Sequence, residues 1–271
     1  EVSPLIMTIK RGILCMQLKE YHKAETIFHL ALSLAQQQDF EEAEMYIYDM
    51  LANNSYEKQD YEKAEKLFIE VLSRYLSMGH DIGEEAVVEI SLKLAMIYSK
   101  KGQLDKANEG FRFCLDSQKT RVKDLLNQKI ENLNEKQINS LALWAMCLDW
   151  YARYLVSIGK FKLAIQYYNQ SLDLCKKING FDHPQTLVLQ NDIATVLMLM
   201  NEVDKAIDCM KKVIKEAIKI DSEDLGTFYY NLGKIYLMQS NFSQAQFACK
   251  ESLNFARQLN DKVLIDMAMD C

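Results

Sequence analysis

Residues 61–71 read YEKAEKLFIEV, which places Tyr61, Ala64, Phe68 and Val71 at spacings of three or four residues. Side chains at these spacings lie on one face of an α-helix. The same order of an apolar residue, an alanine and further apolar or small residues recurs along the chain. The sequence therefore predicts a series of similar amphipathic helices, and a search for an internal repeat decides the fold.

Six alanines, each with an apolar residue three positions earlier, mark the repeat. The pairs are Tyr21/Ala24, Tyr61/Ala64, Leu104/Ala107, Phe161/Ala164, Val203/Ala206 and Phe242/Ala245. Four residues beyond each alanine lie Phe28, Phe68, Phe111, Tyr168, Met210 and Cys249. This ladder predicts the second helix of each repeat.

Upstream of most pairs, a bulky residue followed by a small one predicts the first helix of the repeat. These are Leu51-Ala52, Leu94-Ala95, Tyr151-Ala152, Ile193-Ala194 and Leu232-Gly233, while Arg11-Gly12 keeps only the small member. Small side chains let two antiparallel helices approach closely. Between the helices, Gly102, Gly159 and the pair Ser240-Asn241 predict turns in which Gly or Asn adopts a positive φ.

These bulky, small, aromatic and alanine positions resemble those of the tetratricopeptide repeat family. The resemblance covers nearly the whole chain and implies an all-α fold, a right-handed solenoid of about six helical hairpins in a single domain, residues 1–271. Intervals between the signature alanines exceed the ~34 residues of an ordinary unit, so we expect elongated helices.

One interval is longer than the others and contains an insertion at about residues 116–139. The insertion is polar but keeps Leu125, Leu126, Ile130 and Leu133 near helical spacing. We interpret it as two overlong helices that meet near Asn134-Glu135. A charged linker is the alternative.

Composition narrows the function classes. The chain has only 2 prolines and 9 glycines, as expected where helices follow one another through short turns. Its formal charge of −6 disfavours a nucleic-acid partner, because binding the phosphate backbone needs concentrated Lys and Arg. The seven cysteines show no zinc-ligand spacing and indicate a reduced protein without disulfides, with Cys271 unassigned. No apolar run is long enough to span a bilayer, so membrane association would need a segment outside this chain.

The sequence offers no catalytic, metal or cofactor motif. The histidines His22, His29, His80 and His183 form no triad or metal-binding pattern, and no glycine-rich phosphate loop is present. We therefore expect no enzyme, no cofactor and no metal site. The most direct interpretation is a protein-binding scaffold.

Members of this family usually hold a partner segment on the surface formed by their first helices. Projection from the bulky and small positions predicts a binding groove lined by Tyr46, Asp49, Asn53, Tyr56, Asp149, Arg153, Asn191, Tyr230 and Lys234, together with Leu92, Met96 and Thr195. Asn53, Asp149, Arg153 and Asn191 are the main candidates for polar contacts. Asp149 and Arg153 could instead pair with each other.

Two further resemblances bear on function. Residues 180–186, GFDHPQT, are similar to the repeat junction of kinesin light chains, with Asp182 as the expected N-cap and His183 as junction structure. Residues 46–53, 89–98, 146–155 and 183–186 resemble a mitochondrial branch of the family. That branch implies a factor on the matrix face of the inner membrane that binds respiratory complex III and helps clear fragments of its Rieske iron-sulfur protein. A cytosolic cargo or signalling adaptor of the kinesin-light-chain kind is the alternative.

Overall fold

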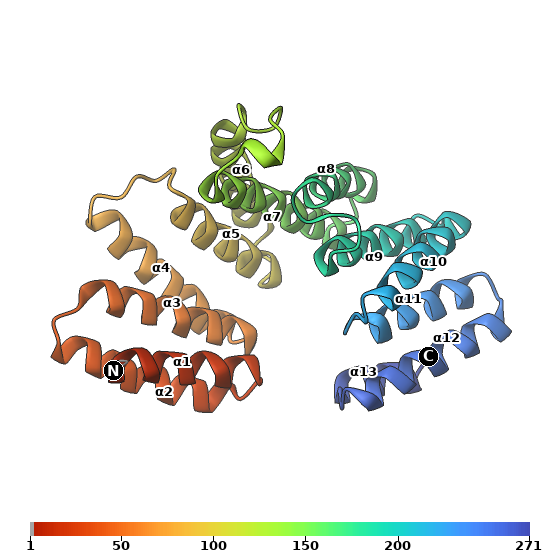
Figure 1. Cartoon of the computed structure of the whole chain (residues 1–271), viewed down its shortest axis with the longest axis horizontal. Coiled ribbons are helices and arrows are strands. Elements are labelled where there is room, and N and C mark those ends of the chain that lie inside the picture. Colours follow the sequence, from red (N-terminus) through yellow and green to blue (C-terminus); the bar gives the residue numbers. More distant parts are fainter. Residues whose placement is uncertain (1–2) are drawn as a thin grey trace. The chain divides into compact units, whose positions relative to one another are not determined.

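The computed structural model describes residues 3–271, which contain thirteen α-helices and no β-strand (Figure 1). The first helices of the pairs are α1 (Pro4–Gln17), α3 (Glu41–Glu57), α5 (Glu85–Lys100), α7 (Glu135–Ser157), α9 (Pro184–Leu199) and α11 (Leu225–Met238). The second helices are α2 (Tyr21–Gln37), α4 (Tyr61–Ser77), α6 (Leu104–Val122), α8 (Phe161–Asn179), α10 (Val203–Lys219) and α12 (Phe242–Gln258). A short α13 (Lys262–Met269) follows, and the all-α expectation is confirmed.

The helices group into two compact units, residues 1–120 and residues 121–271, and each is described by itself. In unit 1, α1 to α4 pack as antiparallel neighbours, followed by α5 and most of α6 (Figure 1). In unit 2, α7 to α12 pack as three consecutive pairs, and α13 packs against α12. A single domain for the whole chain stays a prediction.

The repeat signature predicts the start of every second helix. Helices α2, α4, α6, α8, α10 and α12 begin at the apolar member of the six pairs. Their alanines are buried, as are Phe28, Phe68 and Phe111 one turn later. Small residues mark the closest approaches: a Cβ added at Gly110 would lie 2.9 Å from the Cβ of Ala95 on the paired helix. The predicted packing contacts are therefore the ones that hold the hairpins together.

The turns within the pairs share one geometry. Gly102 and Gly159 have φ values of 73° and 74°, as expected. At Ser240-Asn241 it is Ser240 that has the positive φ, 59°, while Asn241 caps α12 by accepting from the Gln244 amide, so the expected role of Asn241 was wrong. Lys19 adopts the same conformation, and the Glu20 amide donates to the Cys15 carbonyl in a Schellman pattern.

The insertion differs from two helices that meet directly. Helix α6 already ends at Val122, well before the expected meeting point, whereas α7 begins at Glu135 with Asn134 as the N-cap of a capping box. Turns and the 3-10 helix η1 (Ile130–Asn132) lie between them. Both α6 and α7 are longer than the 17 residues of α4. Within unit 2, the segment is held against α8, because Lys177 Nζ donates to the Leu126 carbonyl over 2.9 Å.

The junction before α9 corrects a second detail. The N-cap is His183 rather than Asp182, and its Nδ1 accepts from the Gln185 amide over 3.2 Å. Pro184 occupies the first turn, where no hydrogen-bond donor is needed. Thr186 Oγ1 donates to the Gly180 carbonyl over 2.9 Å and closes the loop. The interpretation of His183 as junction structure is confirmed.

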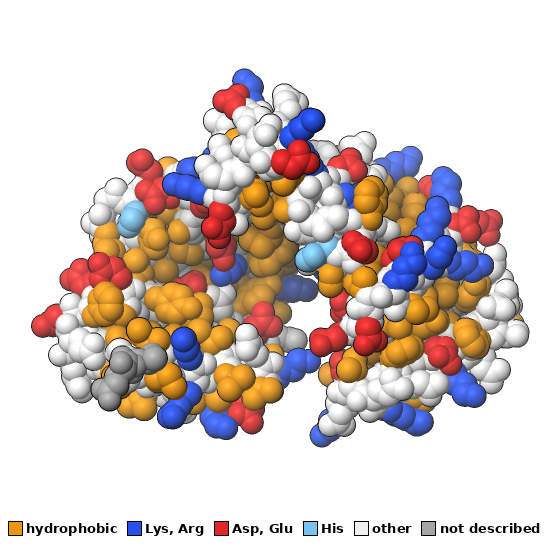
Figure 2. Space-filling view, in the orientation of Figure 1, with side chains coloured by type: hydrophobic (Ala, Val, Ile, Leu, Met, Phe, Trp, Pro, Cys, Tyr) orange, Lys and Arg blue, Asp and Glu red, His pale blue; other side chains and the backbone are white. Residues whose placement is uncertain are grey.

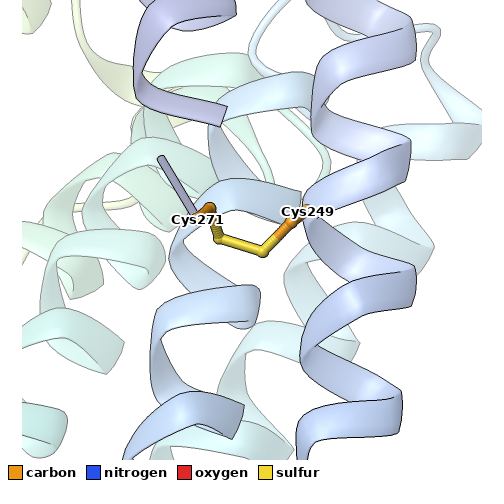
Figure 3. The surroundings of a disulfide bond; sticks show 2 residues. All are labelled: Cys249 and Cys271. Atoms are coloured by element: carbon orange, nitrogen blue, oxygen red, sulfur yellow. A yellow bond between two sulfur atoms is a disulfide. The ribbon is translucent and has the colours of Figure 1, made fainter. Parts of the chain in front are cut away.

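The expectation of a chain without disulfides was wrong. Cys249 on α12 is bonded to Cys271, with Cα atoms 5.8 Å apart, and the bond ties the segment after α13 to the last helix pair (Figure 3). Spacing along the chain could not reveal this, because the turn before α13 folds Cys271 back against α12 and Gly233. The other five cysteines are not disulfide-bonded. Between Ser3 and Cys271, no helix is long and apolar enough to cross a membrane.

Replacing Ala64 by Leu tests the packing. Ala64 is fully buried, so the added methylenes should lower the free energy of unfolding by about 1–3 kcal/mol. Lys66→Leu, at an exposed position on the same helix, is the matched control and should change it by less than about 0.5 kcal/mol. Denaturant unfolding measures both, and equal stabilities of Ala64→Leu and the parent would contradict the predicted contact.

Cys271→Ser tests the disulfide. Opening a loop closed over a sequence separation of 22 residues should cost about 3 kcal/mol, because the unfolded chain gains entropy. The difference between variant and parent in thermal melts should vanish in the presence of a reductant. Alkylation of both Cys249 and Cys271 in the unreduced protein would show that the bond is not formed.

Candidate functional site

A groove of about 600 Å³ opens in unit 1 between α3, α4 and α5. Its lining residues are Glu42, Met45, Tyr46 and Asp49 from α3, Val71 and Tyr75 from α4, Met78 and His80 from the following loop, and Ala86, Glu89, Ile90 and Lys93 from α5. Two of the predicted groove residues, Tyr46 and Asp49, are among them. Figure 2 shows hydrophobic side chains over this part of unit 1, with acidic side chains beside them.

The position of the groove follows from an unusually long connection. Three residues separate α2 from α3, but seven separate Ser77 at the end of α4 from Glu85 at the start of α5. The loop is held in place by His80, whose Nδ1 lies 3.0 Å from Glu84 and whose ring lies 4.3 Å from that of Tyr75. The groove lies beside this loop, and apolar side chains of α3, α4 and α5 line it.

The polar groups of the groove centre on Asp49. Asn53 Nδ2 donates to Asp49 Oδ2 over 2.9 Å, so the amide that was expected to hold a partner is engaged within the helix. Burial raises the pKa of Asp49, the Lys93 ammonium opposes this, and Glu89 adds to it. Lys93 Nζ lies 3.1 Å from a Glu89 carboxylate oxygen. Lys93 is thus shared between two carboxylates.

Asp149 and Arg153 are placed differently, inside an ion cluster of unit 2. Arg153 Nε donates to Asp149 Oδ1 over 3.0 Å on the same helix, and Arg153 Nη2 lies 2.6 Å from Asp192 Oδ2 on α9. Asp149 is buried. The guanidinium therefore joins two consecutive first helices, which agrees with the alternative that Asp149 and Arg153 pair with each other.

The cluster continues across α9 to α11. Asn191 Nδ2 donates to Asp192 Oδ1 over 3.3 Å and its Oδ1 accepts from Asn231 Nδ2 over 2.8 Å. Burial raises the pKa of Asp192 to about 6, although Arg153 acts against the shift. Burial also lowers the pKa of Arg153, but Asp192 and Asp149 outweigh it and raise the net value. Asn191 therefore contributes to a buried network between neighbouring repeats.

The remaining predicted groove residues lie apart. Tyr56 packs edge-on against Tyr61, with ring centroids 6.0 Å apart. On α11, Lys234 Nζ lies 5.5 Å from the centroid of the Tyr230 ring. Leu92 and Met96 are buried, so the expectation that they line the groove was wrong.

Sequence reasoning missed Glu89, Lys93 and Asp192. Glu89 and Lys93 lie one helical turn apart in residues 89–98, so their i, i+4 charge pair was a visible signal. Asp192 precedes Ile193 of the bulky and small pair, which marks it as part of a first helix. Its partner Arg153 is far away in sequence, and no local pattern indicates that contact.

Arg153→Met should destabilise unit 2 by about 2–3 kcal/mol, because two largely buried carboxylates lose their cation while the partly exposed guanidinium limits the loss. The triple variant Arg153→Met, Asp149→Asn, Asp192→Asn removes the uncompensated charges and should recover at least half of that stability. Urea unfolding compares the three proteins. A single variant as stable as the parent would mean that the cluster contributes nothing.

Comparison with known proteins gives the family. A family model of the tetratricopeptide repeat matches residues 144–215. Tetratricopeptide repeat protein 19, mitochondrial, of Rattus norvegicus is 33% identical over 96% of this chain and 71% of its own length. The Homo sapiens protein of that name is also 33% identical, over 97% of this chain and 70% of its own length. A Drosophila melanogaster homologue is 28% identical over 98% of this chain and 70% of its own length.

Solved structures share the fold at low sequence identity. BtubC from P. vanneervenii superimposes with a TM-score of 0.62 and 18% identity, covering 96% of this chain and 93% of that protein. A Rap protein complexed with competence and sporulation factor has a TM-score of 0.68 and 13% identity, covering 98% of this chain and 73% of that protein. The helical hairpins of the structure and the identity to the rat and human proteins lead to one conclusion: the chain belongs to the tetratricopeptide repeat protein 19 family.

Proposed function

We propose that this protein is a non-enzymatic scaffold of mitochondria that binds respiratory complex III and supports its assembly and maintenance by promoting clearance of Rieske iron-sulfur protein fragments. Its relatives are named as mitochondrial proteins, and the resemblance at residues 46–53, 89–98 and 146–155 implies this role. The proposed location is the matrix face of the inner membrane, reached through a segment outside this chain.

The observation that carries the proposal is the open groove between α3, α4 and α5. A partner segment needs apolar surface that folding leaves uncovered, together with a few polar groups that fix its orientation. Tyr46 and Met78 each keep 46% of their surface exposed at the groove. In the Arg153 cluster, by contrast, the guanidinium is already engaged by Asp149 and Asp192. We therefore assign partner binding to the α3–α5 groove in preference to the region around Asp149, Arg153 and Asn191.

Affinity capture from detergent-solubilised mitochondria tests the assignment. The immobilised parent should retain complex III subunits and Rieske fragments. The variant Tyr46→Ala, Met78→Ala should retain about thirtyfold less, because two apolar anchors worth roughly 1 kcal/mol each are truncated. Leu30→Ala, Ile69→Ala is the matched control, since both residues are exposed apolar side chains of second helices in the same unit.

Thermal melts of both variants should match the parent, so that a loss of capture reports on contact rather than on folding. Equal recovery of complex III by the groove variant would remove the groove assignment. Failure of the parent to capture complex III, with motor or signalling subunits recovered from whole-cell extract instead, would favour the cytosolic adaptor.

A further inference from the structure

The charge of the chain is divided unevenly between its two units. Acidic and basic side chains balance in residues 121–271, so the whole formal charge of −6 resides in residues 1–120. Three glutamates occupy the first turn of α3, and one of them, Glu42, lines the groove. Acidic side chains of unit 1 therefore lie beside its apolar groove, where they would attract a basic partner.

Asp49 and Asp149 occupy equivalent repeat positions but have different partners. Each lies two residues before the bulky and small pair of its helix, Leu51-Ala52 or Tyr151-Ala152. Four residues after Asp149 is Arg153, which forms an ion pair with it. Four residues after Asp49 is Asn53, which donates a hydrogen bond but brings no charge. The ionised Asp49 thus depends on a lysine already paired with Glu89.

The apolar lining of the α3–α5 groove consists of large side chains, several of them flexible. Met45, Met78, Tyr46 and Tyr75 surround the space, and Ile90 lies on the α5 side. Methionine side chains adapt to differently shaped apolar groups, and tyrosine rings provide rigid contact area. Such a surface accepts bulky aliphatic or aromatic side chains of a partner without requiring one shape.

We propose that the α3–α5 groove binds a basic amphipathic segment, whose apolar side chains enter the groove while a Lys or Arg pairs with Asp49 and a second cation with Glu42. The inference rests on the proposed function in that it names the chemistry of the partner that the scaffold takes. A cation from the partner would give Asp49 a direct ion pair like the one that Asp149 forms with Arg153. The arrangement disfavours acidic segments, because Glu42 and Asp49 would repel them, whereas Lys93 is engaged by Glu89.

Fluorescence anisotropy with three synthetic peptides of equal length tests this chemistry. One carries Leu on one helical face and Arg on the other, the second replaces Arg by Glu, and the third replaces Leu by Ser. The Leu/Arg peptide should bind the parent at least tenfold more tightly than either of the others. Its affinity should fall as salt is raised, since part of the attraction is between charges.

Charge-removing variants locate the contact. Asp49→Asn, Glu42→Gln should weaken the Leu/Arg peptide about tenfold. Asp105→Asn, Glu109→Gln removes two exposed carboxylates from α6 of the same unit and should change the affinity less than twofold. Equal weakening by both variants would show diffuse attraction to unit 1, and equal binding of the Leu/Glu peptide would refute the charge argument. Either result overturns the proposal.

Two further outcomes separate this inference from the proposed function. If the Leu/Arg peptide binds in the groove but the parent captures no complex III, the proposed function fails and the groove chemistry stands. If complex III is captured equally by the parent and by Asp49→Asn, Glu42→Gln while the peptide does not bind, the groove chemistry fails alone. A concentration-dependent dimer in sedimentation, absent in that variant, would identify a second copy as the occupant and overturn the proposal.

Discussion

Close contact between paired helices at small residues is the constraint on which the rest of the structure depends. At Gly233 an added Cβ would lie 2.7 Å from Cys249 Sγ, and at Gly12 it would overlap the ring of Phe28. There is space for one large side chain at each contact and no room for a second. Because dispersion and burial act over the whole helix length only when the backbones approach, the alternation of small and large residues fixes the register of every hairpin. Everything displayed on the first helices is positioned by that register.

The same constraint explains how much of the fold the sequence predicts. The spacing of Tyr61, Ala64 and Phe68 reports which face is buried, and the helix starts follow because the turn before each pair is short. Features that depend on distant partners could not be predicted in this way. Asp192 meets Arg153 across two repeats, and Cys271 meets Cys249 only after α13 has folded back. The N-cap of α9 is His183 rather than the expected Asp182. Both side chains can accept a hydrogen bond from the first turn, and the sequence pattern does not decide between two such neighbours.

The candidate site was predicted in part for the same reason. The position of a residue within the repeat indicates whether it faces away from the paired helix, and Tyr46 and Asp49, two residues chosen in this way, line the groove. It carries no information on the loop of residues 78–84, whose length separates α4 from α5 and creates the space. It also cannot distinguish an open position from one closed by its neighbours. Leu92 and Met96 are buried although they stand in the same positions relative to Leu94 as Asp49 and Asn53 do relative to Leu51.

The residue four positions after the aspartate differs between two equivalent repeats, Asn53 in one and Arg153 in the other. This residue decides whether the aspartate is paired within the protein or remains able to pair with a partner. With arginine four residues after the aspartate, the planar guanidinium reaches its own helix and the next first helix, so Asp149 and Asp192 each form a direct ion pair with it. With asparagine there, Asp49 gains a hydrogen bond but no counter-charge, and its pKa is raised by burial. A half-buried carboxylate beside exposed apolar side chains is costly for folding alone. The cost falls when a cation arrives together with apolar groups, because the cation compensates the charge while the apolar groups exclude water and strengthen the attraction. The groove of unit 1 thus has a physical reason to prefer a segment that carries both.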